Sequence, residues 1–262
     1  MAKTDSSPMA SKVPEVTALF WIVKILTTGA GETGSDFLVT HVNPVLGVAT
    51  GFVLFAVAMT LQFRARRYIP AIYWFAVVMV SVFGTMCADV LHVGLDVPYA
   101  VSAPAFAVIL AAVFFFWRGS EGTLSIHSIT TSRRETFYWA TVLATFALGT
   151  ATGDLTATTF HLGYLTSGIV FTIVICIPAI GYAARRFGPI LAFWFAYVVT
   201  RPIGASFADW MGVSRARSGL DLGTGPVTLA LLVVIGVLVL VLSVQAGRDP
   251  HASQSVPAVP SN

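Results

Sequence analysis

Long apolar stretches alternate with short polar connections along almost the whole chain. Each stretch has about 18 to 23 residues, enough to cross ~30 Å of hydrocarbon at 1.5 Å per residue, and none shows the alternation of a barrel strand. Because a backbone in lipid must satisfy its own hydrogen bonds, we predict eight membrane-spanning helices. These spans lie roughly at residues 16–38, 45–62, 69–91, 98–117, 136–158, 163–182, 189–211 and 224–245.

The composition supports lipid as the solvent for this chain. Of its 262 residues, 56% are hydrophobic and 10% are charged, too few polar side chains to cover a water-soluble globule of this size. The predicted fold class is therefore an all-α polytopic membrane protein. The polar start of the chain has no cleavage site after a short apolar region, so we expect no removable signal peptide. Cys87 and Cys176 fall inside predicted spans and are expected to pack as free thiols.

Basic residues are distributed unequally between the two sides of the membrane. Eleven lie in the terminal segments or in the connections after even-numbered spans, against only Arg215 and Arg217 in the opposite loops. The positive-inside rule then places both termini in the cytoplasm, with the chain in the cell (inner) membrane. Since the basic residues follow this topology pattern, the net charge of +3 does not indicate nucleic-acid binding. The polar, Pro- and Ser-rich tail, residues 248–262, is predicted to be disordered.

An internal repeat organises the chain. Four tryptophans are each preceded by Phe or Tyr and followed by Gly after ten residues and Asp after fifteen. Their spacing equals two spans with connections, so four parallel two-helix units enter the membrane in the same direction. A cytoplasmic segment, residues 1–12, precedes the units, which cover about 13–67, 68–118, 131–187 and 188–247. The repeated residues are Trp21, Trp74, Trp139 and Trp194, then Gly31, Gly84, Gly149 and Gly204, then Asp36, Asp89, Asp154 and Asp209.

This pattern resembles the bacterial family of integral membrane proteins that have four tandem two-helix repeats of unknown function and a signature tryptophan in each repeat. The resemblance covers nearly all of residues 13–247. It implies membrane location and fourfold internal repetition, and it brings no activity with it.

The repeated positions have different expected roles. The aromatic pairs are expected to anchor the helices at the cytoplasmic headgroup boundary, and the glycines to permit close contact between helices. The aspartates lie ~22 Å beyond the tryptophans, at a depth where an ionisable group costs ~2.5–3.5 kcal/mol and indicates function. The alternative is that each aspartate caps the following structure or meets the outer headgroups.

A polar stripe accompanies the aspartates. Positions four and seven residues earlier share their helix face and are rich in threonine, although a threonine hydroxyl can instead bind its own backbone. Two basic residues also lie within the spans. Arg201 needs a buried partner, for which Glu32 and Asp209 are the candidates, whereas Lys24 is expected to reach back to the cytoplasmic surface. The stripe consists of Glu32, Thr27, Thr85, Thr145, Thr150 and Thr200.

These residues favour a transporter or channel for a cation, most of all a divalent metal ion, lined by the odd-numbered helices. Three histidines that follow motif aspartates, His41, His92 and His161, would add ligands suited to a transition metal if they converge. One alternative is a proton-coupled carrier of a small organic solute, with Arg201 binding an anionic group; another is a membrane protein that transports nothing. We expect neither catalysis nor a resident cofactor, because no HExxH, GxSxG, CxxCH or phosphate-loop motif is present. The expected partners are the lipid bilayer and the transported ion or solute, and the oligomeric state stays open.

Overall fold

The computed structural model describes residues 11–248. Residues 249–262 of the predicted disordered tail and residues 1–10 of the predicted cytoplasmic segment lie outside these residues, whereas Arg248 ends the last helix. Within them the fold is all-helical, without a strand. The α-helices are α1 (Ala18–His41), α2 (Pro44–Arg64), α3 (Pro70–Asp89), α4 (Tyr99–Glu121), α5 (Ser132–Asp154), α6 (Tyr164–Val174), α7 (Cys176–Ala183), α8 (Pro189–Gly212) and α9 (Thr224–Arg248). The short segments are the π-helical η1 (Val90–Gly94) and η3 (Leu155–Thr159) and the 3₁₀ turns η2 (Ile126–Ser128) and η4 (Arg215–Arg217).

Residues at the helix ends account for the boundaries. The Thr17 and Thr131 hydroxyls cap α1 and α5 by accepting backbone N–H bonds, and α2, α3 and α8 begin with a proline, which loses nothing at a first-turn position. The predicted span 163–182 is divided into α6 and α7. Pro178 explains the division, because it has no N–H to donate to the carbonyl of Val174.

Six helical segments among residues 11–248 are long and apolar enough to cross a membrane: α2, α3 with η1, α4, α6 with α7, α8 and α9. Helices α1 and α5, of 24 and 23 residues, have a suitable length but a more polar composition. A multi-pass membrane protein is therefore indicated, and the count of eight spans stays a prediction.

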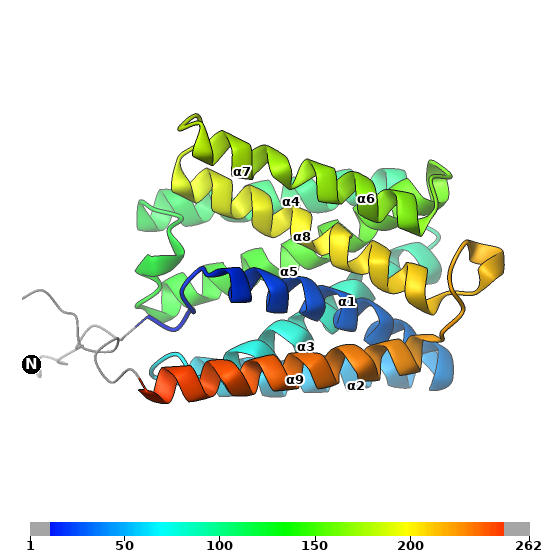
Figure 1. Ribbon diagram of the computed structural model, residues 1–262, viewed down its shortest axis with the longest axis horizontal. Helices are drawn as coiled ribbons and strands as arrows, with labels where there is room; N and C mark the ends of the chain where they lie inside the picture. Colours follow the sequence, from blue (N-terminus) through cyan, green and yellow to red (C-terminus); the bar gives the residue numbers. More distant parts are fainter. Residues whose placement is uncertain (1–10, 249–262) are drawn as a thin grey trace, which may run out of the picture.

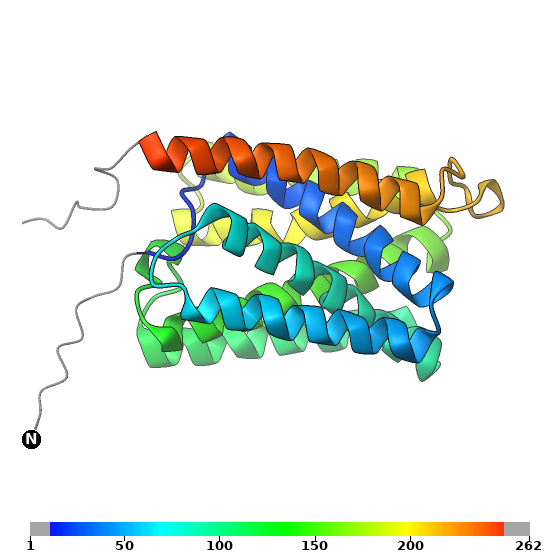
Figure 2. The same ribbon diagram turned by 90° about the horizontal axis from the view of Figure 1, so that it is seen from below.

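Four helices form the inner part of the bundle. Helix α1 contacts α3 and α8, and α5 also contacts α3 and α8, so the first helices of the four repeats close a ring. The others pack outside it: α2 on α3, α4 on α5, α6 and α7 on α8, and α9 on α1. Figures 1 and 2 show this bundle from two sides. Each repeat thus packs its second helix on the first helix of the next repeat, and the fourth repeat packs on the first.

The motif aromatics form a closed ring of their own. Within each repeat the aromatic residue meets the following tryptophan at 75–88°, with ring centroids 5.1–5.2 Å apart, a favourable edge-to-face geometry. The aromatic residue before each tryptophan also contacts the tryptophan of the next repeat, with ring centroids 5.6–6.2 Å apart. Phe193 of the fourth repeat contacts Trp21 of the first, which closes the ring. The expectation that these pairs anchor the helices at the headgroup boundary is wrong for most of them, because they pack inside the bundle. Those that are buried are Phe20, Tyr73, Tyr138, Trp74, Trp139 and Trp194.

The motif glycines lie where neighbouring ring helices cross. A Cβ at each of them would overlap the residue seven positions after the tryptophan of the next repeat. The prediction that the glycines permit close helix contact is therefore confirmed. The pairs are Gly31 with Ser81, Gly84 with Phe146, Gly149 with Arg201, and Gly204 with Thr28.

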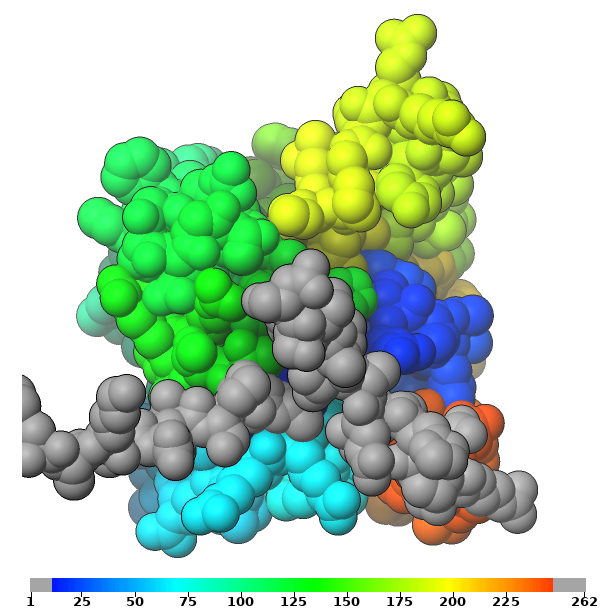
Figure 3. All heavy atoms as spheres, turned by 90° about the vertical axis from the view of Figure 1, so that its left-hand side faces the viewer, coloured from blue at the N-terminus to red at the C-terminus, as the bar shows by residue number. Residues whose placement is uncertain are grey.

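Both ends of the described chain lie at the end of the bundle that carries the tryptophans, which we name the aromatic end (Figure 1). Figure 3 views this end and shows segments of all four repeats around it. Lys12 packs into the bundle here: its Nζ lies 2.6 Å from Glu135 Oε2 and 3.3 Å from the carbonyl oxygen of Phe63. Gln62 donates to the other Glu135 oxygen at 3.0 Å. The predicted cytoplasmic segment therefore ends in a buried ion pair.

Candidate functional site

Arg201 lies within the ring of α1, α3, α5 and α8 and is 0% exposed. Its side chain crosses α5 at Gly149, and its guanidinium carbon lies 5.1 Å from the centre of the Phe146 ring. Although Pro202 follows it, α8 continues as one helix to Gly212. A guanidinium that is enclosed in this way needs protein groups that compensate its charge. Its two terminal nitrogens have such partners, whereas its Nε has no hydrogen-bond partner within residues 11–248.

Glu32 of α1 is the ionic partner of Arg201. Glu32 Oε2 lies 2.5 Å from Arg201 Nη2, and both side chains are buried. Arg201 Nη1 also donates to the carbonyl oxygen of Thr28 at 2.9 Å. The prediction that Arg201 pairs with an intramembrane carboxylate is confirmed, and of its two candidate partners the structure selects Glu32.

Two threonines connect this ion pair to the other ring helices. Thr150 of α5 accepts a hydrogen bond from Arg201 Nη2 at 2.6 Å, and Thr85 of α3 accepts from the same nitrogen. Each hydroxyl also donates to Glu32 Oε2 at 3.2 Å. Because a hydroxyl can accept and donate at once, both threonines bridge the guanidinium and the carboxylate.

The four residues of this network come from the four repeats. Glu32, Thr85 and Thr150 occupy the same motif position, eleven residues after the tryptophan, where the fourth repeat has Ala205. Arg201 comes from one turn earlier on α8 and reaches the position where Ala205 has no polar atom. We name Glu32, Thr85, Thr150 and Arg201 the central network.

Lys24 is also buried in the ring, at 1% exposure, so the expectation that it reaches the cytoplasmic surface is wrong. Its Nζ lies 4.3 Å from the ring centres of both Phe146 and Tyr197. These cation–π contacts attract the ammonium, but within residues 11–248 its Nζ has no hydrogen-bond partner. Lys24 follows Phe20 by four residues on the same helix face, a spacing that could have indicated a shared inward direction.

The remaining stripe threonines do not join the central network. The hydroxyls of Thr27, Thr145 and Thr200 donate to backbone carbonyls three residues earlier in their own helices, at 2.6–2.8 Å. All three are buried. For them, local backbone bonding explains the hydroxyl without a ligand.

The motif aspartates lie near the opposite end of the ring helices from the tryptophans, which we name the aspartate end. Asp89 and Asp154 end α3 and α5 and are followed directly by the π-helical segments, a feature often found at functional sites. Asp209 is buried, and the other three are half-buried. Each of the four lies at or near the C-terminal end of its ring helix. The structure therefore places the four acids at the same end of the bundle, and their convergence on one site stays a prediction.

A loop arginine lies over this region. Arg217 of η4 donates to the Tyr164 hydroxyl at 2.7 Å, and its guanidinium carbon lies 5.7 Å from the centre of the Tyr164 ring. The aspartate end thus combines four acidic groups with one basic group from outside the predicted spans. Sequence reasoning assigned Arg217 only to an outer loop.

Two of the three candidate metal-binding histidines stack on a nearby aromatic ring instead. His41 is exposed and stacks on Phe37 at 4.5 Å, and His92 stacks on Tyr99 at 3.7 Å. His161 is exposed after η3. Among residues 11–248, no three side chains of His, Cys, Asp or Glu lie close enough to hold one metal ion. The structure does not assemble the imidazole and carboxylate ligand set anticipated from the sequence.

A protein-family model described as Repeat of Unknown Function (DUF347) matches the chain four times, at residues 19–68, 72–123, 137–187 and 192–247. The chain belongs to this family. The four matches of the DUF347 model coincide with the four units that supply the ring helices. Neither the curated proteins nor the solved structures include one that matches this chain. Membership of the DUF347 family supports a helical repeat protein of the membrane and assigns no activity.

Proposed function

We propose that this DUF347 protein is a secondary transporter that crosses the cell (inner) membrane eight times with both termini in the cytoplasm. Its four units run in the same direction, and α1, α3, α5 and α8 surround the pathway. The closed ring of contacts and the arginine distribution support this topology. Helices α1 and α5 tolerate polar residues because their polar side chains face protein inside the bundle. The protein is not an enzyme, and its partners are the lipid bilayer and the transported species.

The substrate that we favour is a small organic anion, carried together with protons. The observation that carries this proposal is the burial of two basic side chains, Lys24 and Arg201, in the same ring. Glu32 neutralises Arg201, whereas Lys24 contacts only aromatic faces and lacks a hydrogen-bond acceptor within the described chain. A buried ammonium without an acceptor is costly. An anionic substrate would supply the acceptors that Lys24 lacks.

Glu32 is the proposed link between protons and substrate. While Glu32 is ionised it occupies Arg201, so an anionic substrate must compete with it. Protonation of Glu32 weakens this ion pair and frees the guanidinium to bind a substrate carboxylate with two parallel hydrogen bonds. At the aspartate end, ionised carboxylates repel an approaching anion, and their protonation removes this repulsion. Anion and proton therefore travel together.

A cation, in particular a divalent metal ion, is the second candidate substrate. The observation that favours it is that Asp36, Asp89, Asp154 and Asp209 all lie at one end of the ring helices. A cation would offset the repulsion between these carboxylates when they are ionised. Direct coordination would require the acids to move together, because no three of the described ligand-type side chains are close enough to share one ion.

Flux measurements in proteoliposomes test both candidates. The panel comprises small mono- and dicarboxylates together with Mn²⁺, Zn²⁺, Ni²⁺ and K⁺, with an internal dye that reports proton entry. We expect the parent protein to take up a carboxylate with protons, and the Lys24→Met and Arg201→Lys variants to lose most of this uptake. Thr27→Val is the matched control, because the buried hydroxyl that it removes serves its own helix.

The variants also separate the two substrates. Cation uptake that survives Lys24→Met and is lost in Asp89→Asn and Asp154→Asn would select the second candidate. Carboxylate uptake that is equal in the parent and in Lys24→Met would remove the argument from the buried ammonium. An inserted parent protein that moves none of these solutes would contradict transport.

A further inference from the structure

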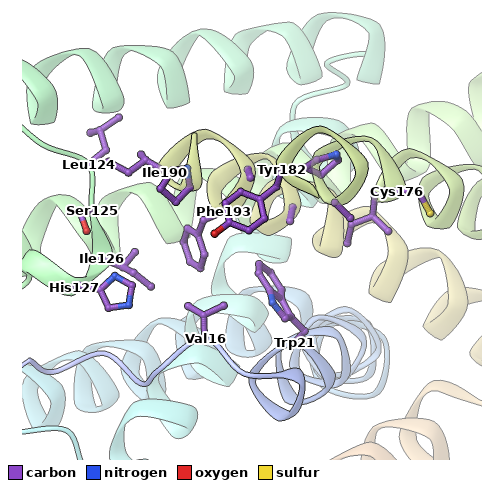
Figure 4. Close-up of a pocket in the computed structure, with 16 residues that line it drawn as sticks. Val16, Trp21, Leu124, Ser125, Ile126, His127, Cys176, Tyr182, Ile190 and Phe193 are labelled. Atoms are coloured by element: carbon purple, nitrogen blue, oxygen red, sulfur yellow. The ribbon is translucent and has the colours of Figure 1, made fainter. Parts of the chain in front are cut away.

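A pocket lies away from the central network, at the aromatic end of the bundle. It is a pocket of about 660 Å³ between α7 and the beginnings of α1 and α8, within the ~300–1,000 Å³ typical of small-molecule sites. Figure 4 shows Trp21, Phe193 and Tyr182 along its walls and the segment before and within η2 at one side. The lining is predominantly apolar.

The break between α6 and α7 belongs to this pocket. Ile175, the residue at the break, and Pro178, which causes it, both line the pocket. The outward faces of α7 remain apolar, since Ile177 and Ile180 are 49% and 66% exposed. In a membrane these faces contact lipid, so the pocket lies beside the bilayer and not deep in the protein.

The pocket has a polar end and an apolar end. Ser125 and His127, in the connection between α4 and α5, form the polar end at the left in Figure 4. Cys176 lies at the opposite end, at the right. Along α7, Cys176 and Tyr182 are separated by six residues, or ~9 Å. Cys176 lies inside the predicted span 163–182, whereas the polar end is at loop level. In the topology proposed above, this polarity matches an amphiphile with its head group at the cytoplasmic surface.

Two arginines follow the end of α7 that lines the pocket. Arg185 and Arg186 follow α7, between the pocket-lining residues Tyr182 and Pro189, and both are exposed. Among residues 11–248, neither has an ion pair with an acidic side chain, unlike Arg133 and Arg134, which pair with Glu121. Their charges are therefore available to an anion at the mouth of the pocket.

We propose that this pocket binds an anionic phospholipid of the cytoplasmic leaflet. One acyl chain lies along α7 toward Cys176, and the phosphate lies near Arg185 and Arg186. The apolar lining excludes a small hydrophilic anion as the occupant. Basic pockets between membrane helices on the cytoplasmic side are suited to such head groups.

Native mass spectrometry of the full chain tests this site. The protein is purified after reconstitution in a mixture of phosphatidylglycerol and phosphatidylethanolamine. We expect about one retained phosphatidylglycerol per chain, with retention reduced about fivefold for each arginine removed in the Arg185→Gln/Arg186→Gln variant. Ala179→Trp, which fills the pocket from exposed α7, should abolish retention. The controls are Arg66→Gln/Arg67→Gln in the connection between α2 and α3, and Ala107→Trp on exposed α4, and both should retain lipid.

A thiol measurement gives an independent readout. In a Cys87→Ser background, N-ethylmaleimide should label Cys176 several-fold more slowly after phosphatidylglycerol is added to delipidated protein, and phosphatidylethanolamine should have little effect. Equal retention of both lipids, equal loss in the control variants, or unchanged labelling would overturn the proposal. A stable complex of two chains that is lost in Ala179→Trp would instead assign the pocket to a second copy of the protein.

Discussion

Arg201 of α8 crosses α5 at Gly149, where the Cβ of any larger residue would overlap the Cβ and Cγ of the arginine. Gly149→Ala must therefore displace Arg201 or separate the two helices. Overpacking of this kind costs about 1–3 kcal/mol, and we expect a lower unfolding temperature in detergent. Gly119→Ala on α4 is the control, because nothing lies within 4 Å of its Cβ position, and it should be neutral or stabilising. Equal losses in the two variants would contradict this packing role.

Glu32 and Arg201 should be strongly coupled in a double-mutant cycle. Glu32→Gln or Arg201→Met alone leaves a buried group without its partner, which costs about 3–5 kcal/mol. The double variant removes both charges, so we expect its loss in free energy of unfolding to be much smaller than the sum of the single losses. Denaturant unfolding of the four proteins measures the coupling. Additive losses would show that the ion pair does not act as a unit.

The Lys12–Glu135 pair should hold the segment before α1 on the bundle. Glu135→Ala leaves a buried ammonium without its carboxylate, so we expect faster hydrogen exchange in residues 11–17 and reduced stability. Arg133→Gln is the matched control on the same helix, because its pair with Glu121 leaves the arginine side chain 67% exposed. Such surface ion pairs contribute about 0–1 kcal/mol to the free energy of unfolding. Unchanged exchange in Glu135→Ala would argue against the tether.

The proposed topology predicts opposite labelling at the two ends of the bundle. In a background without Cys87 and Cys176, an impermeant maleimide added outside intact cells should modify Ala216→Cys in η4. It should not modify Arg66→Cys in the connection between α2 and α3 until the cells are opened. The arginine asymmetry is the physical basis for this expectation. Outside labelling of residue 66 would refute the orientation.

The pattern of residues along the sequence was sufficient to predict the helices and the internal repeat. The length of each apolar stretch predicted the bounds of a helix, or of the pair α6 and α7, to within a few residues. This works because a helix makes its backbone hydrogen bonds within one continuous segment. The recurrence of Gly149 and its equivalents identified the close crossings, since glycine alone lacks a Cβ. The depth of Arg201 showed that it needed a partner, because an uncompensated charge at that depth is costly whichever residue supplies the compensation.

Packing of the whole ring decided which groups meet. A threonine at any stripe position can bind its own backbone, as Thr27 does. Thr85 also bonds the carbonyl oxygen of Ser81, but helix packing brings it and Thr150 to Arg201 as well. Lys24 has the length to reach the surface, yet the closed ring encloses it between aromatic faces. Helical periodicity states which residues share a face. It does not state which face meets which neighbour, or at what distance, because these depend on how side chains from all four repeats fill one common interior.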